Sequence, residues 1–191
     1  MKISIIREKD LKKADLLQEE ILWEDRKRYG NTFTFFKKRY TKNPSLFIGC
    51  YDKSKLVGII FGYIKRNYVS LSTMAISSDY RSKGIGSKML NVFERNVKKL
   101  GKKRILLGAR NNAEKFYLNN GYKPIIFVQI YHKNVPKDYK NKGYNIISET
   151  NYKDAKRLYI DIKKYDKKIK EKVLKTFKAY NVIYLFEKDL E

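Results

Sequence analysis

A short glycine-bearing loop at residues 81–87, RSKGIGS, has the composition of a phosphate-binding turn. It lies between an apolar stretch and an amphipathic one, so we expect it to join a strand to the start of a helix. Helix N-termini present unpaired N–H groups and a partial positive charge, which suit a pyrophosphate. Gly84 and Gly86 would let the backbone approach phosphate oxygens closely, and Arg81 and Lys83 add positive charge. Taken alone, the two glycines are equally compatible with a plain strand-to-helix turn.

Two other phosphate-binding motifs do not match this loop. A P-loop requires GxxxxGK[ST], which does not occur in the chain. A dinucleotide-binding turn requires GxGxxG, and the position of its third glycine is occupied by Met89. The loop therefore needs a different phosphate-binding fold around it.

The elements on either side of the loop follow from the hydrophobic pattern. A strand at 68–76 precedes it, and a helix over 86–100 with one apolar face follows it and stops at Gly101. A short strand at 104–107 and a helix that begins at Asn112 and ends at Gly121 come next. A further β-rich run covers residues 122–131.

The N-terminal part of the chain supplies the rest of a sheet. We expect a first strand at 2–7, helices at 11–28 and 32–40, and an antiparallel meander of strands at 45–51, 56–65 and 68–76. This order predicts an α+β fold with a mixed, mostly antiparallel sheet flanked by helices.

Beyond the last of these runs the chain becomes polar. Residues 133–143, KNVPKDYKNKG, read as a linker between a main domain at 1–132 and a small ββαβ C-terminal module at 144–191. A module of this size rarely buries enough core to fold alone. We expect it to pack on the main domain or on a second subunit, the latter giving a homodimer.

Two stretches around the loop resemble the GNAT superfamily of N-acetyltransferases. LSTMAISSDYRSKGIGSKML is similar to that superfamily's strand, phosphate loop with an R-x-x-G-x-G pattern, and helix. LLGARNNAEKFYLNNGYKPI resembles its second characteristic region, A-R-x-N-A-x-x-F-Y-x-x-x-G-[FY], and the two occur in the same order as in the family. The resemblance implies a GNAT-like acyl-CoA N-acyltransferase fold over residues 1–132.

The resemblance also implies a site for acetyl-CoA as cosubstrate. In the family, the strand before the loop diverges from its neighbour and its backbone pairs with the pantetheine amides, while amides of the loop hold the pyrophosphate. Asn112 matches a position that often contacts the cofactor, besides being a helix cap. The implied cofactor-binding residues are Met74, Ala75, Ile76, Arg81, Ser82, Lys83, Gly84, Ile85, Gly86, Ser87 and Asn112.

For catalysis, the resemblance implies direct acetyl transfer to an amine within a ternary complex. Tyr117 matches the family position of a tyrosine that protonates the leaving sulfur, although it would equally serve as a core aromatic. The backbone N–H of Met74 or Ala75 would polarise the carbonyl group.

A general base does not stand out. The strand YVSLSTMAI holds no carboxylate, so its Ser70, Ser72 and Thr73 would at most position water. An acidic cluster, Glu19, Glu20, Glu24 and Asp25, would either wall the acceptor site or form a solvated helix face.

The amino-acid composition argues against several other classes of protein. The single cysteine, Cys50, and the single histidine, His132, argue against a metal site and a disulfide. The chain has no long apolar run for a membrane span, and its start is unlike a signal peptide, so a cytoplasmic location is expected. The net charge of +24 reflects either a polyanionic partner or a Lys-, Ile-, Asn- and Tyr-rich genome bias.

The sequence therefore predicts an acetyl-CoA-dependent N-acetyltransferase that acts on an unidentified primary amine, with no metal. Two alternatives stay open. One is a basic nucleic-acid-binding protein on an acyltransferase scaffold, supported by the charge and by the tyrosines at 139, 144, 152, 159 and 165. The other is an acetyl-CoA sensor without turnover, suggested by the missing base.

Overall fold

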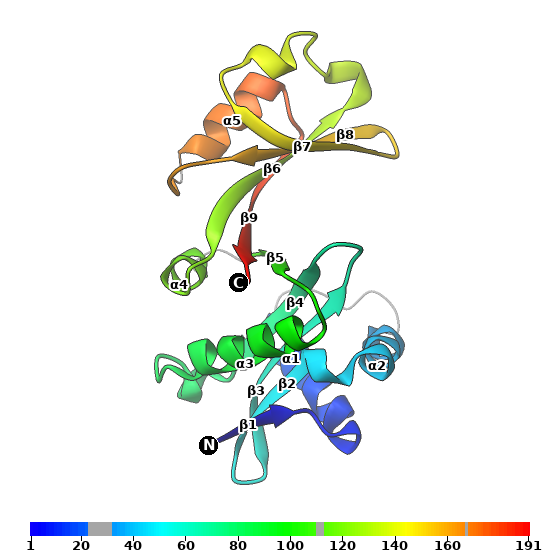
Figure 1. Cartoon of the computed structure of the whole chain (residues 1–191), viewed down its shortest axis with the longest axis vertical. Helices are drawn as coiled ribbons and strands as arrows, with labels where there is room; N and C mark the ends of the chain where they lie inside the picture. Colours follow the sequence, from blue (N-terminus) through cyan, green and yellow to red (C-terminus); the bar gives the residue numbers. More distant parts are fainter. Residues whose placement is uncertain (23–31, 110–112, 167) are drawn as a thin grey trace. The chain divides into compact units, whose positions relative to one another are not determined.

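The computed structural model describes residues 1–22, 32–109, 113–166 and 168–191. They form two compact units, one of Met1–Leu106 with Asp189–Glu191 and one of Leu107–Lys188. Each unit combines helices with β-strands and has its own buried core (Figure 1). The fold class is therefore α+β, as predicted.

The first unit contains the elements that were expected around the glycine-bearing loop. The predicted order of strands and helices is confirmed, and α1 is described as far as Leu22 because residues 23–31 lie outside the described part. Its elements are β1 (Lys2–Ile5), α1 (Leu11–Leu22), α2 (Thr32–Lys42), β2 (Phe47–Asp52), β3 (Lys55–Ile64), β4 (Val69–Ile76), α3 (Ile85–Lys99) and the start of β5 (Arg104–Gly108).

The strands of this unit are arranged in the order β1-β2-β3-β4-β5. The pairs β1–β2, β2–β3 and β3–β4 are antiparallel, and β5 runs parallel to β4. The register places Phe61 opposite both Phe47 and Thr73, so that buried side chains line up across three strands. The sheet is mixed but mostly antiparallel, as the meander predicted.

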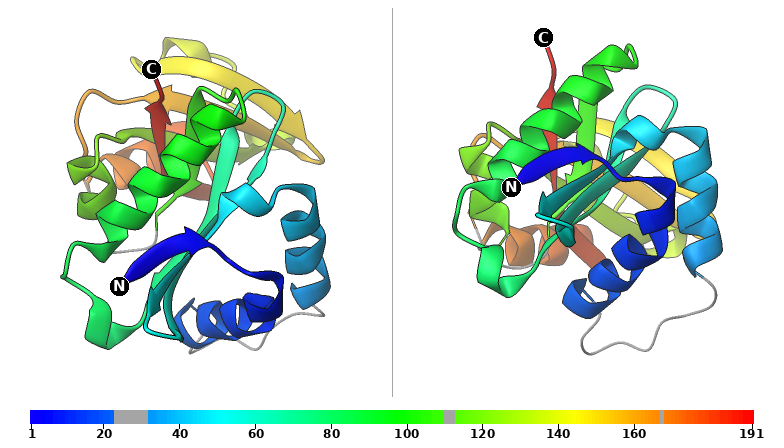
Figure 2. Two further views of the ribbon diagram at one scale, coloured as in Figure 1. Left: turned by 60° about the horizontal axis from the view of Figure 1, so that its bottom comes forward. Right: turned by 90° about the horizontal axis from the view of Figure 1, so that it is seen from below.

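Helices cover both faces of the sheet in the first unit (Figure 2). On one face, Phe36 of α2 packs edge-on against Phe47 and Phe61, with ring centroids 5.1 and 4.9 Å away. On the other face, α3 inserts Met89 and Phe93, which are fully buried. The loop before α3 is therefore attached to a helix that the core holds in place.

Gly62 of β3 is required for the close packing of α3. A Cβ atom here would lie 2.5 Å from the carbonyl oxygen of Ser70 and 2.7 Å from the Phe93 ring. We expect Gly62→Ala to lower the free energy of unfolding by about 1–3 kcal/mol, the usual cost of overpacking a core. Gly58→Ala on the same strand is the control, because its Cβ would lie 3.2 Å from the flexible Met89 sulfur, 3.3 Å from the Ile76 side chain and 3.5 Å, an ordinary contact, from the Ala75 carbonyl oxygen. Urea unfolding of both variants measures the difference, and equal stabilities would contradict this packing.

The second unit is a sheet in the order β9-β6-β8-β7 with helices on one face. All its neighbouring strands are antiparallel. Val173 and Phe177 of the C-terminal helix are buried, whereas Leu174 is 42% exposed. The elements are α4 (Glu114–Asn119), β6 (Lys123–Tyr131), β7 (Asn145–Tyr152), β8 (Ala155–Asp161), α5 (Ile169–Phe177) and β9 (Asn181–Asp189).

The compact units divide the chain near residue 107, within the main domain expected at 1–132. The reason is strand pairing, because β6 lies between β8 and β9 and pairs with both along seven register positions. The ββαβ elements of residues 144–191 are present as predicted, but they extend the sheet that β6 begins.

None of the helices among the described residues combines the length and the apolar character that a membrane span requires.

Candidate functional site

The loop between β4 and α3 has a backbone that leaves space for a ligand. Gly84 precedes the first helical residue with φ +71°, and an added Cβ atom would meet nothing within 4 Å. Ser82 also adopts a positive φ of 59°. Gly84 is therefore required for its left-handed backbone conformation, which most residues adopt only with strain.

The N-terminus of α3 has no side-chain cap at its N-cap position. Gly84 occupies that position and has no side chain to accept a hydrogen bond, and no acidic residue lies in the first turn. The opening N–H groups of a helix need an acceptor, and the helix dipole favours an anionic one. The first turn, which contains Gly86 and Ser87, is thus suited to binding phosphate oxygens.

The two cations of the loop are held differently. The Arg81 Nε donates a hydrogen bond to the carbonyl oxygen of Ile76 at 2.9 Å, so this side chain links the loop to the end of β4. The Lys83 Nζ lies 5.5 Å from the Tyr80 ring centroid and remains exposed. Both side chains are exposed, so both charges lie beside the loop, and Arg81 is the one that also fixes the loop to β4.

Strand β4 has a free edge beside the loop. Residues 69–76 of β4 pair with β3, whereas among the described residues its pairing with β5 is limited to Val69 and Ser70. Met74, Ala75 and Ile76 therefore have a strand partner on one side only. Backbone groups on such an edge are ready to pair with the amides of an extended ligand.

A buried polar chain links β4 to α1, and the sequence analysis did not identify it. Thr73, 8% exposed, donates to Gln18 at 3.4 Å, and Gln18 donates to Asp15 at 2.8 Å. Asp15 is completely buried. The signal was present, because Asp15 and Gln18 lie at i+4 and i+7 from the buried Leu11 on the apolar face of α1.

Tyr117 lies in the second unit, in α4. It is 7% exposed, and burial raises its pKa to about 12. The rings of Phe116, Tyr122 and Phe186 surround it at centroid distances of 5.1, 5.7 and 6.0 Å. Its phenol is therefore protonated at any ordinary pH, so it is a hydrogen-bond donor and a weaker acid than a free tyrosine.

The remaining candidate residues add little to the description of the site. Asn112 lies outside the described residues, as do Glu24 and Asp25 of the acidic cluster. Burial raises the pKa of the Cys50 thiol, which makes this cysteine unreactive. Among the described residues, His, Cys, Asp and Glu side chains form no group of three or more that could hold a metal ion.

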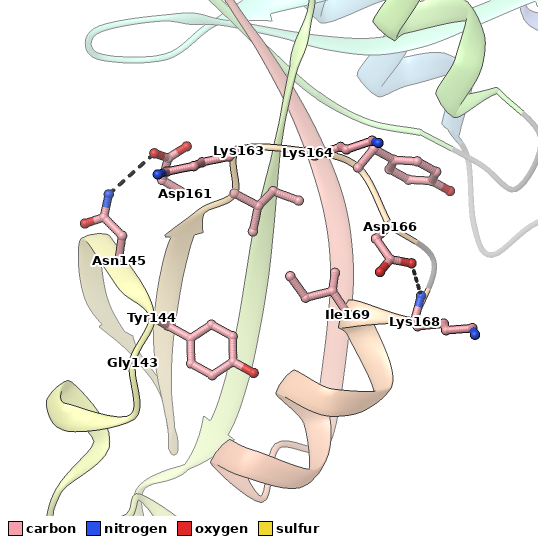
Figure 3. Close-up of a pocket in the computed structure, with 11 residues that line it drawn as sticks. Gly143, Tyr144, Asn145, Asp161, Lys163, Lys164, Asp166, Lys168 and Ile169 are labelled. Atoms are coloured by element: carbon pink, nitrogen blue, oxygen red, sulfur yellow. Dashed lines mark hydrogen bonds between the residues drawn. The ribbon is translucent and has the colours of Figure 1, made fainter.

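A cavity of about 910 Å³ lies in the second unit, between the start of β7 and the β8–α5 connection (Figure 3). None of the residues predicted to bind acetyl-CoA or to catalyse its reaction lines it. The Tyr144 ring, just before β7, points toward α5, with its centroid 5.4 Å from that of Phe177, and its hydroxyl has no hydrogen-bond partner among the described residues.

Comparison with known proteins shows which family has sequences like this one. Residues 18–137 match the acetyltransferase (GNAT) domain family, a range that includes both β4 and the loop. A search of curated protein sequences found no match.

Solved structures show the same fold at low sequence identity. A GNAT-family acetyltransferase from Staphylococcus aureus is 18% identical, with a TM-score of 0.56 over 84% of this chain and 97% of that one. An aminoglycoside 6′-N-acetyltransferase complexed with coenzyme A is 17% identical, with a TM-score of 0.54 over 87% and 100%. The ribosomal-protein-S18-alanine N-acetyltransferase from Escherichia coli is 14% identical, with a TM-score of 0.51 over 87% and 96%.

Proposed function

Because this chain belongs to the GNAT acetyltransferase family, we propose that it transfers the acetyl group of acetyl-CoA to a primary amine. The observation that carries the proposal is the uncapped N-terminus of α3, which the loop of residues 77–84 joins to a strand with a free edge. The first feature suits a pyrophosphate and the second an extended amide-bearing arm. Coenzyme A has both.

In this proposal the cofactor lies along β4 and the loop. The backbone amides of residues 82–87 hold the pyrophosphate, and Lys83 adds charge. The backbone of Met74, Ala75 and Ile76 pairs with the pantetheine arm. Arg81 acts through its hydrogen bond to Ile76, which keeps the loop at the end of the strand. Asn112 is the remaining proposed contact.

The reaction joins the amine nitrogen to the thioester carbonyl carbon and breaks the carbon–sulfur bond. The N–H of Met74 or Ala75 stabilises the oxyanion that forms. Tyr117 donates a hydrogen bond to the leaving sulfur. With a pKa of about 12, its phenol stabilises the thiolate without having to give up its proton completely.

The attacking amine must be neutral and loses a proton during the reaction. The β4 strand offers no carboxylate for this purpose. Ser70 and Ser72 would position a water molecule that accepts the proton. Thr73 is directed to Gln18 instead, so we assign it a supporting role in holding β4.

The test is an acetyl-transfer assay with the purified protein, acetyl-CoA and a panel of amines. The release of the free thiol of coenzyme A measures turnover, with and without an amine. The amine panel contains an aminoglycoside, a peptide with an N-terminal alanine, a lysine-containing peptide and a polyamine. The first two are the acceptor classes named for the similar structures. We expect thiol release with at least one amine and acetylated product by mass spectrometry. Acetyl-CoA binding without turnover on any amine would favour the sensor, and absence of binding would refute the proposal.

A further inference from the structure

The sheet of the second unit has one face that its helices do not cover. Along β6, Ile126, Val128 and Ile130 are buried on one face. On the opposite face Ile125 is also buried, whereas Phe127 and Tyr131 remain partly exposed. The register continues this second face across the sheet. Phe127 lies opposite Tyr159 and Ile183, Gln129 opposite Arg157 and Asn181, and Tyr152 of β7 lies opposite Ala155. This set of side chains is called the aromatic face below.

Planar groups on the aromatic face are stacked or close together. The Arg157 guanidinium lies 3.9 Å from the Tyr152 ring centroid and 5.7 Å from that of Phe127. The rings of Phe127 and Tyr159 are 5.1 Å apart. The Nε of Arg157 has no hydrogen-bond partner among the described residues, so stacking is what holds this side chain in place. Half of Tyr152 is still exposed, which leaves ring surface for a further planar partner.

A second stacked pair lies at the same end of the sheet. The rings of Tyr131 and Tyr180 are 4.2 Å apart and nearly parallel, and the two side chains are 38% and 44% exposed. Beside Tyr131 is a cavity of about 620 Å³ that His132, Lys133 and Asp154 complete. This tyrosine pair presents flat ring surface to solvent, on which a planar ligand can stack.

Cations are more numerous than carboxylates at one end of the aromatic face. Arg157, Lys133 and Lys153 lie at the end with the exposed rings, beside the carboxylate of Asp154, and Lys153 is 5.7 Å from the Tyr152 ring. At the other end, Asp161 and Glu187 lie opposite Ile125 and Lys123 of β6. The ring-bearing end is thus suited to an anion in a chain with a net charge of +24.

We propose that the aromatic face binds single-stranded nucleic acid. Unpaired bases would stack on Tyr152 and on the Tyr131–Tyr180 pair, while Arg157, Lys153 and Lys133 contact the phosphates. Flat rings with interleaved cations match a ligand that alternates flat bases with anionic groups, which an acidic peptide does not. This function is separate from acetyl transfer and uses none of the residues proposed for it.

Fluorescence anisotropy with a labelled, unstructured oligouridine of about 12 nucleotides tests the proposal on the full chain at about 150 mM salt. We expect binding in the micromolar range, weakened about tenfold by Tyr152→Ala and by Tyr131→Ala. Arg157→Lys keeps the charge but loses the stacked plane, and we expect about a fivefold loss. The matched control is Phe35→Ala, because Phe35 is a 69% exposed aromatic residue of α2 in the first unit. It should bind like the native protein.

Three results would overturn the proposal. One is equal weakening by Phe35→Ala, and another is equally tight binding of a duplex of the same length. The third is displacement by heparin as efficiently as by unlabelled oligouridine, because heparin is a polyanion without bases. Thermal unfolding of each variant shows whether a loss of binding reflects a loss of fold, and Arg157→Lys, the mildest change, keeps the test decisive if an alanine variant unfolds.

Discussion

Replacing Gly86 with tryptophan is expected to weaken acetyl-CoA binding more than about 100-fold. Gly86 is the second residue of α3, and its backbone lies in the uncapped first turn. An indole at this position would occupy the space proposed for the pyrophosphate. Gly86 is a better choice than Gly84, because Gly84 has a φ of +71° and a side chain there would also strain the backbone. Isothermal titration calorimetry measures the dissociation constant.

The matched control for this change is Asn91→Trp. Asn91 is an exposed, uncharged residue of the same helix, more than one turn beyond Gly86. We expect it to bind acetyl-CoA like the native protein. If Gly86→Trp binds acetyl-CoA normally while folded, the loop does not hold the pyrophosphate and the proposed cofactor site is wrong.

Tyr117→Phe is expected to lower kcat about 10- to 100-fold while changing the KM for acetyl-CoA less than about threefold. The variant keeps the ring that packs against Phe116, Tyr122 and Phe186 and removes only the hydroxyl. A hydrogen-bond donor to the leaving sulfur stabilises the transition state more than the ground state, so its loss lowers kcat. Steady-state kinetics with the amine found in the panel gives both constants.

Tyr122→Phe is the control, since its ring centroid is 5.7 Å from that of Tyr117 and the same atom is removed. Its kcat should stay within about twofold of the native value. Unchanged kcat in Tyr117→Phe would leave Tyr117 as a core aromatic residue and move the proton donor elsewhere.

The pKa of Tyr117 also determines how activity depends on pH. Because burial raises this pKa to about 12, the phenol keeps its proton up to about pH 10, and kcat should not fall on the alkaline side below that value. The raised pKa of Tyr117 also makes the free energy of unfolding depend on pH. As pH rises from about 10 to 12 the unfolded phenol ionises and the folded one does not, so unfolding becomes more favourable there. An alkaline fall in kcat near pH 8–9 that disappears in Tyr117→Phe would contradict the raised pKa.

The sequence by itself determined the local elements of the fold and the type of loop between β4 and α3. The apolar spacing of α3 predicted the buried face correctly, since Met89, Leu90, Phe93 and Val97 are all buried. Glycines at 84 and 86 after a strand predicted a tight strand-to-helix turn, and the positive φ of Gly84 confirms the turn, whereas ligand binding by it stays a prediction. These features depend on residues within a few positions of one another, so periodicity and backbone preferences are sufficient to find them.

The sequence was less informative about which strands pair. The C-terminal elements looked like a separate module, because their own pattern is consistent with a ββαβ unit. In the structure β6 lies between β8 and β9, with Ile126 opposite both Ile160 and Tyr184. Alternating side chains show that a strand has a buried face, but they do not specify the strand beside it.

Only the tertiary structure decided how distant residues combine chemically. Thr73 and Gln18 are 55 positions apart in the chain and share a hydrogen bond, and Arg157 stacks on Tyr152 across a hairpin. The raised pKa of Tyr117 likewise comes from the burial of α4. Hydrogen bonds, stacking and desolvation depend on distances in space. The order of residues in the sequence does not give these distances, because they arise only when the chain folds.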